Sequence, residues 1–180
     1  MFVASQKRKE NIAEYLLYMW QVEDMLRANS LDMERIEKTL VEPSGLSDEQ
    51  KEQLRRWYES LIDMMRREEV VEHGHLQLNR NTLGQLVDLH RRLLADPKES
   101  DYHALFYKTL PYIVELRSKA GENKAGEIET CFNFLYGILL MRLQGRQLSS
   151  ETQSALVEIS RFLALLAQKF HEEENNPPQD

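Results

Sequence analysis

Apolar residues recur every three or four positions along most of the chain, with charged and polar residues between them. This is the period of an amphipathic α-helix, and no stretch shows the strict alternation typical of a half-buried β-strand. The pattern predicts an all-α fold, a helical bundle of about six to seven helices. The expected helices span about residues 5–27, 33–42, 48 to a break at 72–75, the surroundings of 83–94, 97–118, 127–144 and 150–172.

Two of these helices are apolar enough to be central. The segment 11–27 is apolar over most of its circumference, with one broad face and a second face on the opposite side that contains Trp20. A helix that buries two faces needs neighbours on both, so we expect helix one and helix six, residues 127–144, at the centre of the bundle. Pro111 falls inside helix five, where the missing N–H predicts a kink.

Residues at the expected helix ends favour starts and stops. Ser47 to Gln50 and Ser150 to Gln153 both have the spacing of a capping box. Asp96 followed by Pro97 is typical of a helix start, and Gly74 is suited to the end of a helix. With 180 residues, the chain is predicted to form a single all-helical domain over 1–172, followed by a disordered acidic tail over 173–180.

The net charge of −7 disfavours nucleic acid and anionic membranes as partners, because both call for a basic surface. The most apolar run, residues 131–143, is shorter than the roughly 20 residues that a membrane span requires. The lone Cys131 cannot form an intramolecular disulfide and is expected to be a buried thiol in a reducing compartment. These features predict a cytoplasmic protein that does not bind membranes.

Candidate chemistry is sparse. Glu72 and His75 form a Glu-x-x-His pair, which di-metal helical bundles use in two copies together with two further Glu residues. No second copy is present, so we predict no metal site and no cofactor. His90 faces the expected core and His103 lies near the start of helix five, and both are predicted to be structural.

Arg67 and His73 suggest an enzymatic alternative. Their spacing resembles the Arg-x4-6-His motif of a family of helical ribonucleases known as bacterial toxins. In such a site, His73 would act as general acid or base and Arg67 would stabilise charge on phosphate. One such spacing is expected by chance among the Arg and His residues of this chain, and the acidic residues between the two would repel RNA.

A second alternative is a small-ligand site beside the first helix. Glu14 and Gln21 lie two turns apart, with Tyr18 at the edge of the same stripe. Such groups could line a polar pocket between helices. The same stripe also fits an exposed strip or a buried hydrogen-bond network that fixes helix register.

Three segments carry a family resemblance: residues 9–24, Gly74-His-Leu-Gln77 and Leu89-His-Arg-Arg-Leu-Leu94. Together they make the chain similar to a family of small Bacteroidetes proteins classed only as a domain of unknown function. The resemblance implies an all-helical protein without an assigned activity or site. Because helix-packing surface is abundant and assembled chemistry is not, the leading hypothesis is a non-enzymatic bundle that binds another protein or itself.

Overall fold

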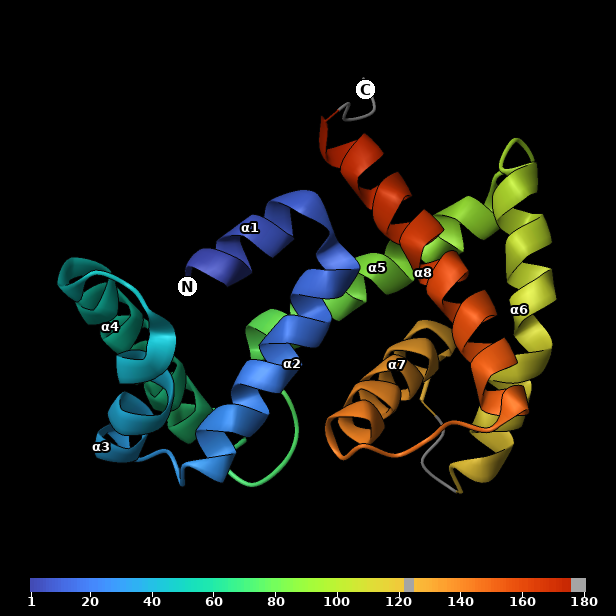
Figure 1. The fold of residues 1–180 in the computed structure, drawn as a ribbon. Helices are drawn as coiled ribbons and strands as arrows, with labels where there is room; N and C mark the ends of the chain where they lie inside the picture. The colour runs from blue at the N-terminus through green and yellow to red at the C-terminus, as the bar shows by residue number, and fades with distance from the viewer. Residues whose placement is uncertain (122–124, 176–180) are drawn as a thin grey trace. The chain divides into compact units, whose positions relative to one another are not determined.

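The computed structural model describes residues 1–121 and 125–175, and every regular element within these ranges is helical (Figure 1). This confirms the predicted all-α class. The eight α-helices are α1 (Phe2–Glu10), α2 (Ile12–Ala28), α3 (Met33–Ile36), α4 (Asp48–Arg67), α5 (Gln77–Ala95), α6 (Ser100–Lys119), α7 (Glu127–Leu143) and α8 (Ser150–Asn175). A π-helical turn (Glu37–Val41) and a 3-10 turn (Glu42–Ser44) follow α3.

The first predicted helix is two helices. The chain breaks at Asn11, whose side-chain Oδ1 accepts a hydrogen bond from the backbone N–H of Ala13 at 3.0 Å. An Asn that satisfies a free donor of the following turn favours a new helix start over continuation. This break accounts for the eighth helix, where six to seven were predicted.

Other helix ends differ from the predictions by a few residues. The Asp96 side chain accepts from Lys98 N and shapes a turn, so α6 begins only at Ser100. At the second predicted capping box, Ser149 rather than Ser150 accepts from Thr152 N. Helix α8 continues to Asn175, into the predicted tail, and residues 176–180 lie outside the described part.

The first predicted capping box is present. Ser47 accepts from the backbone of Gln50 and the Gln50 side chain accepts from the backbone of Ser47. Pro111 lies inside the continuous helix α6. The kink at Pro111 and the central positions of the first and sixth predicted helices stay predictions.

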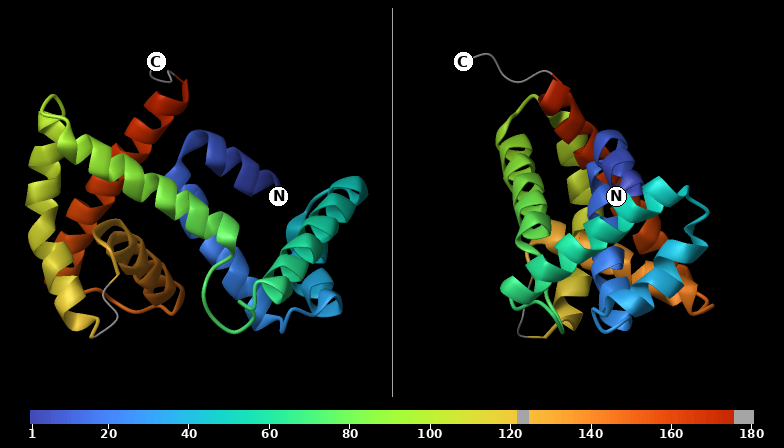
Figure 2. Two further views of the ribbon diagram at one scale, coloured as in Figure 1. Left: turned by 180° about the vertical axis from the view of Figure 1, so that it is seen from behind. Right: turned by 90° about the vertical axis from the view of Figure 1, so that its left-hand side faces the viewer.

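Contacts between residues divide the chain into two compact units. Unit 1 contains residues 1–10 and 14–82, and unit 2 contains residues 11–13 and the chain from Leu83 onward. The boundary at Thr82 falls inside α5, which is one uninterrupted helix (Figure 2). The prediction that residues 1–172 form a single domain stays a prediction.

Unit 1 is built on the apolar faces of α2 and α4. The π-helical turn after α3 packs against α4 (Figure 2). Asp32 caps α3 through the N–H groups of Glu34 and Arg35. The side chains buried in this unit include Leu16, Met19, Trp20, Leu26, Ile36, Leu54, Tyr58, Leu61, Ile62 and Met65.

Unit 2 is built from α6, α7 and α8, which pack against one another, together with the main part of α5 (Figure 1). Its centre is aromatic. The Phe162 ring lies 5.5 Å from the ring of Tyr102 and 5.7 Å from that of Phe106, between centroids. In the described part of the chain, no helix is both long and apolar enough to cross a membrane.

Candidate functional site

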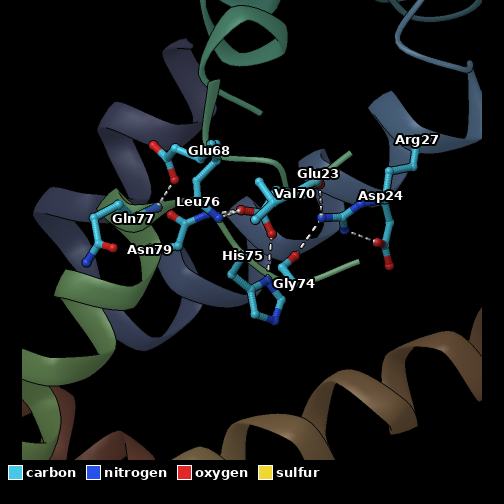
Figure 3. A network of polar contacts seen from close by, with 10 residues as sticks. All are labelled: Glu23, Asp24, Arg27, Glu68, Val70, Gly74, His75, Leu76, Gln77 and Asn79. Carbon is cyan, nitrogen blue, oxygen red and sulfur yellow. Dashed lines mark hydrogen bonds and ion pairs between the residues drawn. The ribbon is translucent and has the colours of Figure 1, made fainter. Parts of the chain in front are cut away.

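The most fully bonded buried carboxylate of unit 1 is that of Glu23 on α2, which has no exposed surface. One oxygen accepts from the backbone N–H of Leu76 at 2.8 Å and from the Asn79 amide at 2.7 Å. The other oxygen lies 2.6 Å from Nδ1 of His75. Figure 3 shows these groups converging on the carboxylate from the chain just before and at the start of α5. We call Glu23, His75, Leu76 and Asn79 the Glu23 network.

The network explains how a charge is tolerated in the core. A buried carboxylate is costly unless it is paired and hydrogen-bonded, and here it accepts from three groups. It also lies at the amino-terminal end of α5, where free N–H groups and the helix dipole favour negative charge. Glu68 adds a second carboxylate there by accepting from Gln77 N. Both acids therefore stabilise the start of α5.

A further side chain of α2 holds the connection between α4 and α5. Arg27 of α2 donates to the carbonyl oxygens of Val70 and Gly74, and it pairs with Asp24 at 2.8 Å (Figure 3). Gly74 has a φ of +87°, a left-handed conformation that glycine adopts without steric cost. The connection is thereby attached to α2 at both of its ends.

His75 supplies the imidazole of this network. Its ring stacks on the buried Trp20, with centroids 4.2 Å apart and planes at 13°. Nδ1 of the ring contacts Glu23, and Nε2 points away from the carboxylate in Figure 3. A carboxylate-oriented imidazole is one half of a catalytic or metal site. Across residues 1–121 and 125–175, however, no three His, Cys, Asp or Glu side chains are placed to hold a metal ion.

A second buried imidazole, His90, lies in unit 2. Its Nδ1 is 2.7 Å from the Tyr102 hydroxyl and its Nε2 is 3.4 Å from a Glu127 oxygen. Burial lowers the pKa of His90, Glu127 partly opposes this, and Arg91 adds to it. The neutral ring accepts from the Tyr102 hydroxyl and donates to Glu127, which matches the structural role predicted for this residue.

We expect His90 to make the protein less stable in acid. Because its pKa is lower in the folded chain than in the unfolded chain, the unfolded chain takes up the proton first as the pH falls below about 6.5. Between about pH 7.5 and about pH 5.5 this lowers the free energy of unfolding by at most about 1.4 kcal/mol. Urea denaturation at both values should show a smaller acid loss for His90→Gln than for the parent. An equal loss in both proteins would contradict the prediction.

His103 and Cys131, which are also predicted to be structural, have the following surroundings. His103 Nε2 is 2.9 Å from the carbonyl oxygen of Leu93. Cys131 is a free, fully buried thiol, and burial raises its pKa to about 12. Such a thiol is a poor nucleophile.

The exposed face of α6 carries two of the three most exposed large apolar side chains in the described part of the chain. Tyr107 is 65% exposed and Val114, two turns later, is 57% exposed. Asp101, Lys108, Glu115 and Lys119 lie along one edge of this face, and Arg117 lies on the other edge. A hollow of about 460 Å³ lies beside the same helix in unit 2, and Glu115 and Lys119 are among its lining residues together with Phe134 and Thr152.

The structure places Arg67 and His73 near each other in the chain but outside any assembled site. Arg67 is the last residue of α4 and His73 lies in the connection, and both side chains are exposed. Within the described residues, neither side chain forms a hydrogen bond or an ion pair. The ribonuclease interpretation stays a prediction.

The stripe of Glu14, Tyr18 and Gln21 lies on the exposed to half-buried side of α2. The Glu14 carboxylate pairs with Lys7 at 2.7 Å, and its side chain is 59% exposed. A hollow of about 200 Å³ does lie beside α2, but Tyr15 and Met19 line it from this helix, and none of the three predicted residues does. Ligand binding at Glu14, Tyr18 and Gln21 stays a prediction.

Sequence reasoning missed Glu23, although a signal was present. Glu23 lies four residues after Met19 and three before Leu26, so it falls in the middle of the apolar face of α2. A lone acid at a core position indicates a buried charge with dedicated partners. Those partners follow more than fifty residues later and have no periodic pattern that points to α2.

Comparison with known proteins places the chain in a family but gives no activity. No curated protein and no solved structure matches it. Residues 1–177 match the model of a family described as domain of unknown function DUF4924, which confirms the resemblance to a domain of unknown function: the chain belongs to that family.

Proposed function

We propose that the chain is a non-enzymatic helical protein that acts by binding protein, and that the exposed face of α6 is its contact surface. One observation carries the proposal. The exposed midline of α6 is uncharged over its whole length, although 29% of the residues in the chain are charged. Large exposed apolar side chains grouped on one face are typical of interaction sites, whereas single ones are ordinary.

The polar groups of the chain support the same proposal. Glu23 and His90, which would be candidates for catalysis by residue type, are buried and bonded to neighbouring groups. A catalytic site needs such groups to converge on a place that substrate can reach. A cytoplasmic location is part of the proposal, since the single cysteine is a free thiol of the kind that persists in a reducing compartment.

Site-specific photo-crosslinking tests the proposal. The photoreactive amino acid p-benzoylphenylalanine replaces Tyr107 in the full chain, and a matched control carries it at Gln168, which is exposed on α8. On irradiation of cells that make each variant, we expect a protein adduct at position 107 and none at position 168. An adduct at neither position, or equal adducts at both, would show that this face is not a contact surface.

A further inference from the structure

The face of α6 has a regular order that goes beyond its lack of charge. Its residues repeat at intervals of seven, which keeps them aligned along a helix that pairs with another. The exposed midline consists of Ser100, Ala104, Tyr107, Pro111, Val114 and Ser118. Tyr107 and Val114 form its apolar part, on either side of Pro111. Small residues at both ends would allow another helix to approach closely.

One edge of this midline carries charges of alternating sign. Along the helix these are Asp101, Lys108, Glu115 and Lys119. Lys108 pairs with Glu158 at 3.0 Å, and Lys119 pairs with Glu115 at 2.6 Å. The side chains of Lys108, Glu115 and Lys119 keep 59%, 60% and 69% of their surface exposed. The Glu115–Lys119 pair is exposed on both sides, so it is weak and exchanges partners at little cost, whereas Glu158, the partner of Lys108, keeps only 13% of its side chain exposed.

From this order we infer that α6 pairs antiparallel with α6 of a second copy of the chain, an inference that rests on the proposed function. The charges along this edge of α6 are minus, plus, minus, plus. In an antiparallel partner they run in the reverse order, so each negative charge faces a positive one. A two-fold axis beside Pro111 therefore sets Lys108 of each copy against Glu115 of the other. It also sets Asp101 against Lys119. The same axis lays Tyr107 close to Val114, and because all three pairings are centred between residues 110 and 112, the apolar and charged registers agree to within one helical turn.

This agreement is what a symmetric dimer requires. In a two-fold interface the same patch serves both subunits and must be complementary to itself. On the opposite edge the axis brings His103 of one copy towards Arg117 of the other. His103 Nε2 lies 2.9 Å from the carbonyl oxygen of Leu93 in its own chain. A parallel two-fold pairing would instead place the first edge of each copy beside the opposite edge of the other. Only the antiparallel arrangement pairs the alternating charges of the first edge with one another.

The dimer should be weak. A helix of 20 residues is about 30 Å long. One helix pair of this length lies at the low end of the surface areas that stable interfaces bury. We expect dissociation constants in the micromolar range, and weaker association at high salt because the edge charges are exposed.

Charge reversal tests the inference by sedimentation velocity over a range of concentrations. Lys108→Glu and Glu115→Lys each create two like-charge contacts across the axis, and each should weaken the dimer at least tenfold. The double variant restores both contacts and should dimerise like the parent. An equimolar mixture of the two single variants should form a heterodimer. The matched control is the exposed Asp88 and Arg91 pair on α5, reversed in the same way, which should change nothing.

The outcomes separate this inference from the proposed function. A parent chain that stays monomeric at millimolar concentration overturns the α6 dimer, but an adduct of position 107 with another protein would then still support the proposed function. A dimer that tolerates both single reversals forms through another surface, which also overturns the inference. Circular dichroism of each variant verifies folding. If the double variant does not fold, the mixture of the two single variants still tests the pairing.

Discussion

Replacing Glu23 by Leu should lower the free energy of unfolding by about 3–5 kcal/mol, since removing one partner of a buried charge arrangement leaves the others without compensation. Three groups lose their acceptor: His75 Nδ1, Leu76 N and the Asn79 amide. Each buried donor left unbonded costs about 1–3 kcal/mol. Urea denaturation followed by circular dichroism measures the change.

Asp24 provides the matched control, because it is the next residue on α2 and has the same charge. Its carboxylate pairs with Arg27, but its side chain is 45% exposed. Asp24→Asn should therefore cost less than about 1 kcal/mol. Near-UV circular dichroism adds a local reading, since the stacking of Trp20 on His75 depends on the Glu23 contact. If Glu23→Leu were as stable as Asp24→Asn, the network would not support the connection between α4 and α5.

The contrast between Glu23 and Glu14 shows how far sequence reasoning reaches. Periodicity correctly predicts that the chain around both residues is helical, because helix formation follows a local repeat of apolar side chains. It draws attention to Glu14, a polar residue between two apolar faces, which proves to be exposed. Glu23 is hidden by the apolar residues around it. Its role depends on Leu76 and Asn79, which approach it only when the connection folds back on α2.

Helix boundaries also show where prediction from sequence succeeds and where it fails. The capping box at Ser47 is local, and the structure contains it as predicted. At Asn11 two local preferences compete, because the apolar pattern continues through the residue while its side chain favours a helix start. The pattern predicts one helix and the structure has two. The exposed face of α6 could also be predicted only in part, since periodicity identifies its apolar residues without showing which of them α7 and α8 leave uncovered.

Phe162→Ala should destabilise unit 2 about as strongly as the Glu23 variant destabilises unit 1. Phe162 is fully buried, and its ring lies 5.7 Å from that of His90 and 5.5 Å from that of Tyr102. Truncating a buried Phe leaves a cavity and costs about 3–5 kcal/mol. For a chain of this size, each kcal/mol lowers the melting temperature by about 2–4 °C. Phe162→Leu keeps most of the volume and should cost less than about 1.5 kcal/mol.

The Phe162 variant also tests whether residues 1–172 fold as one domain. Both tryptophans, Trp20 and Trp57, belong to unit 1, whereas Phe162 belongs to unit 2. Tryptophan fluorescence therefore follows unit 1, and far-UV circular dichroism follows the helices of both units. Because α5 is one helix shared by both units, loss of one end exposes the backbone of the other, and we expect a single cooperative transition. Phe162→Ala should then shift the fluorescence and dichroism transitions equally. A fluorescence transition left at the parent temperature would mean that the two units unfold independently.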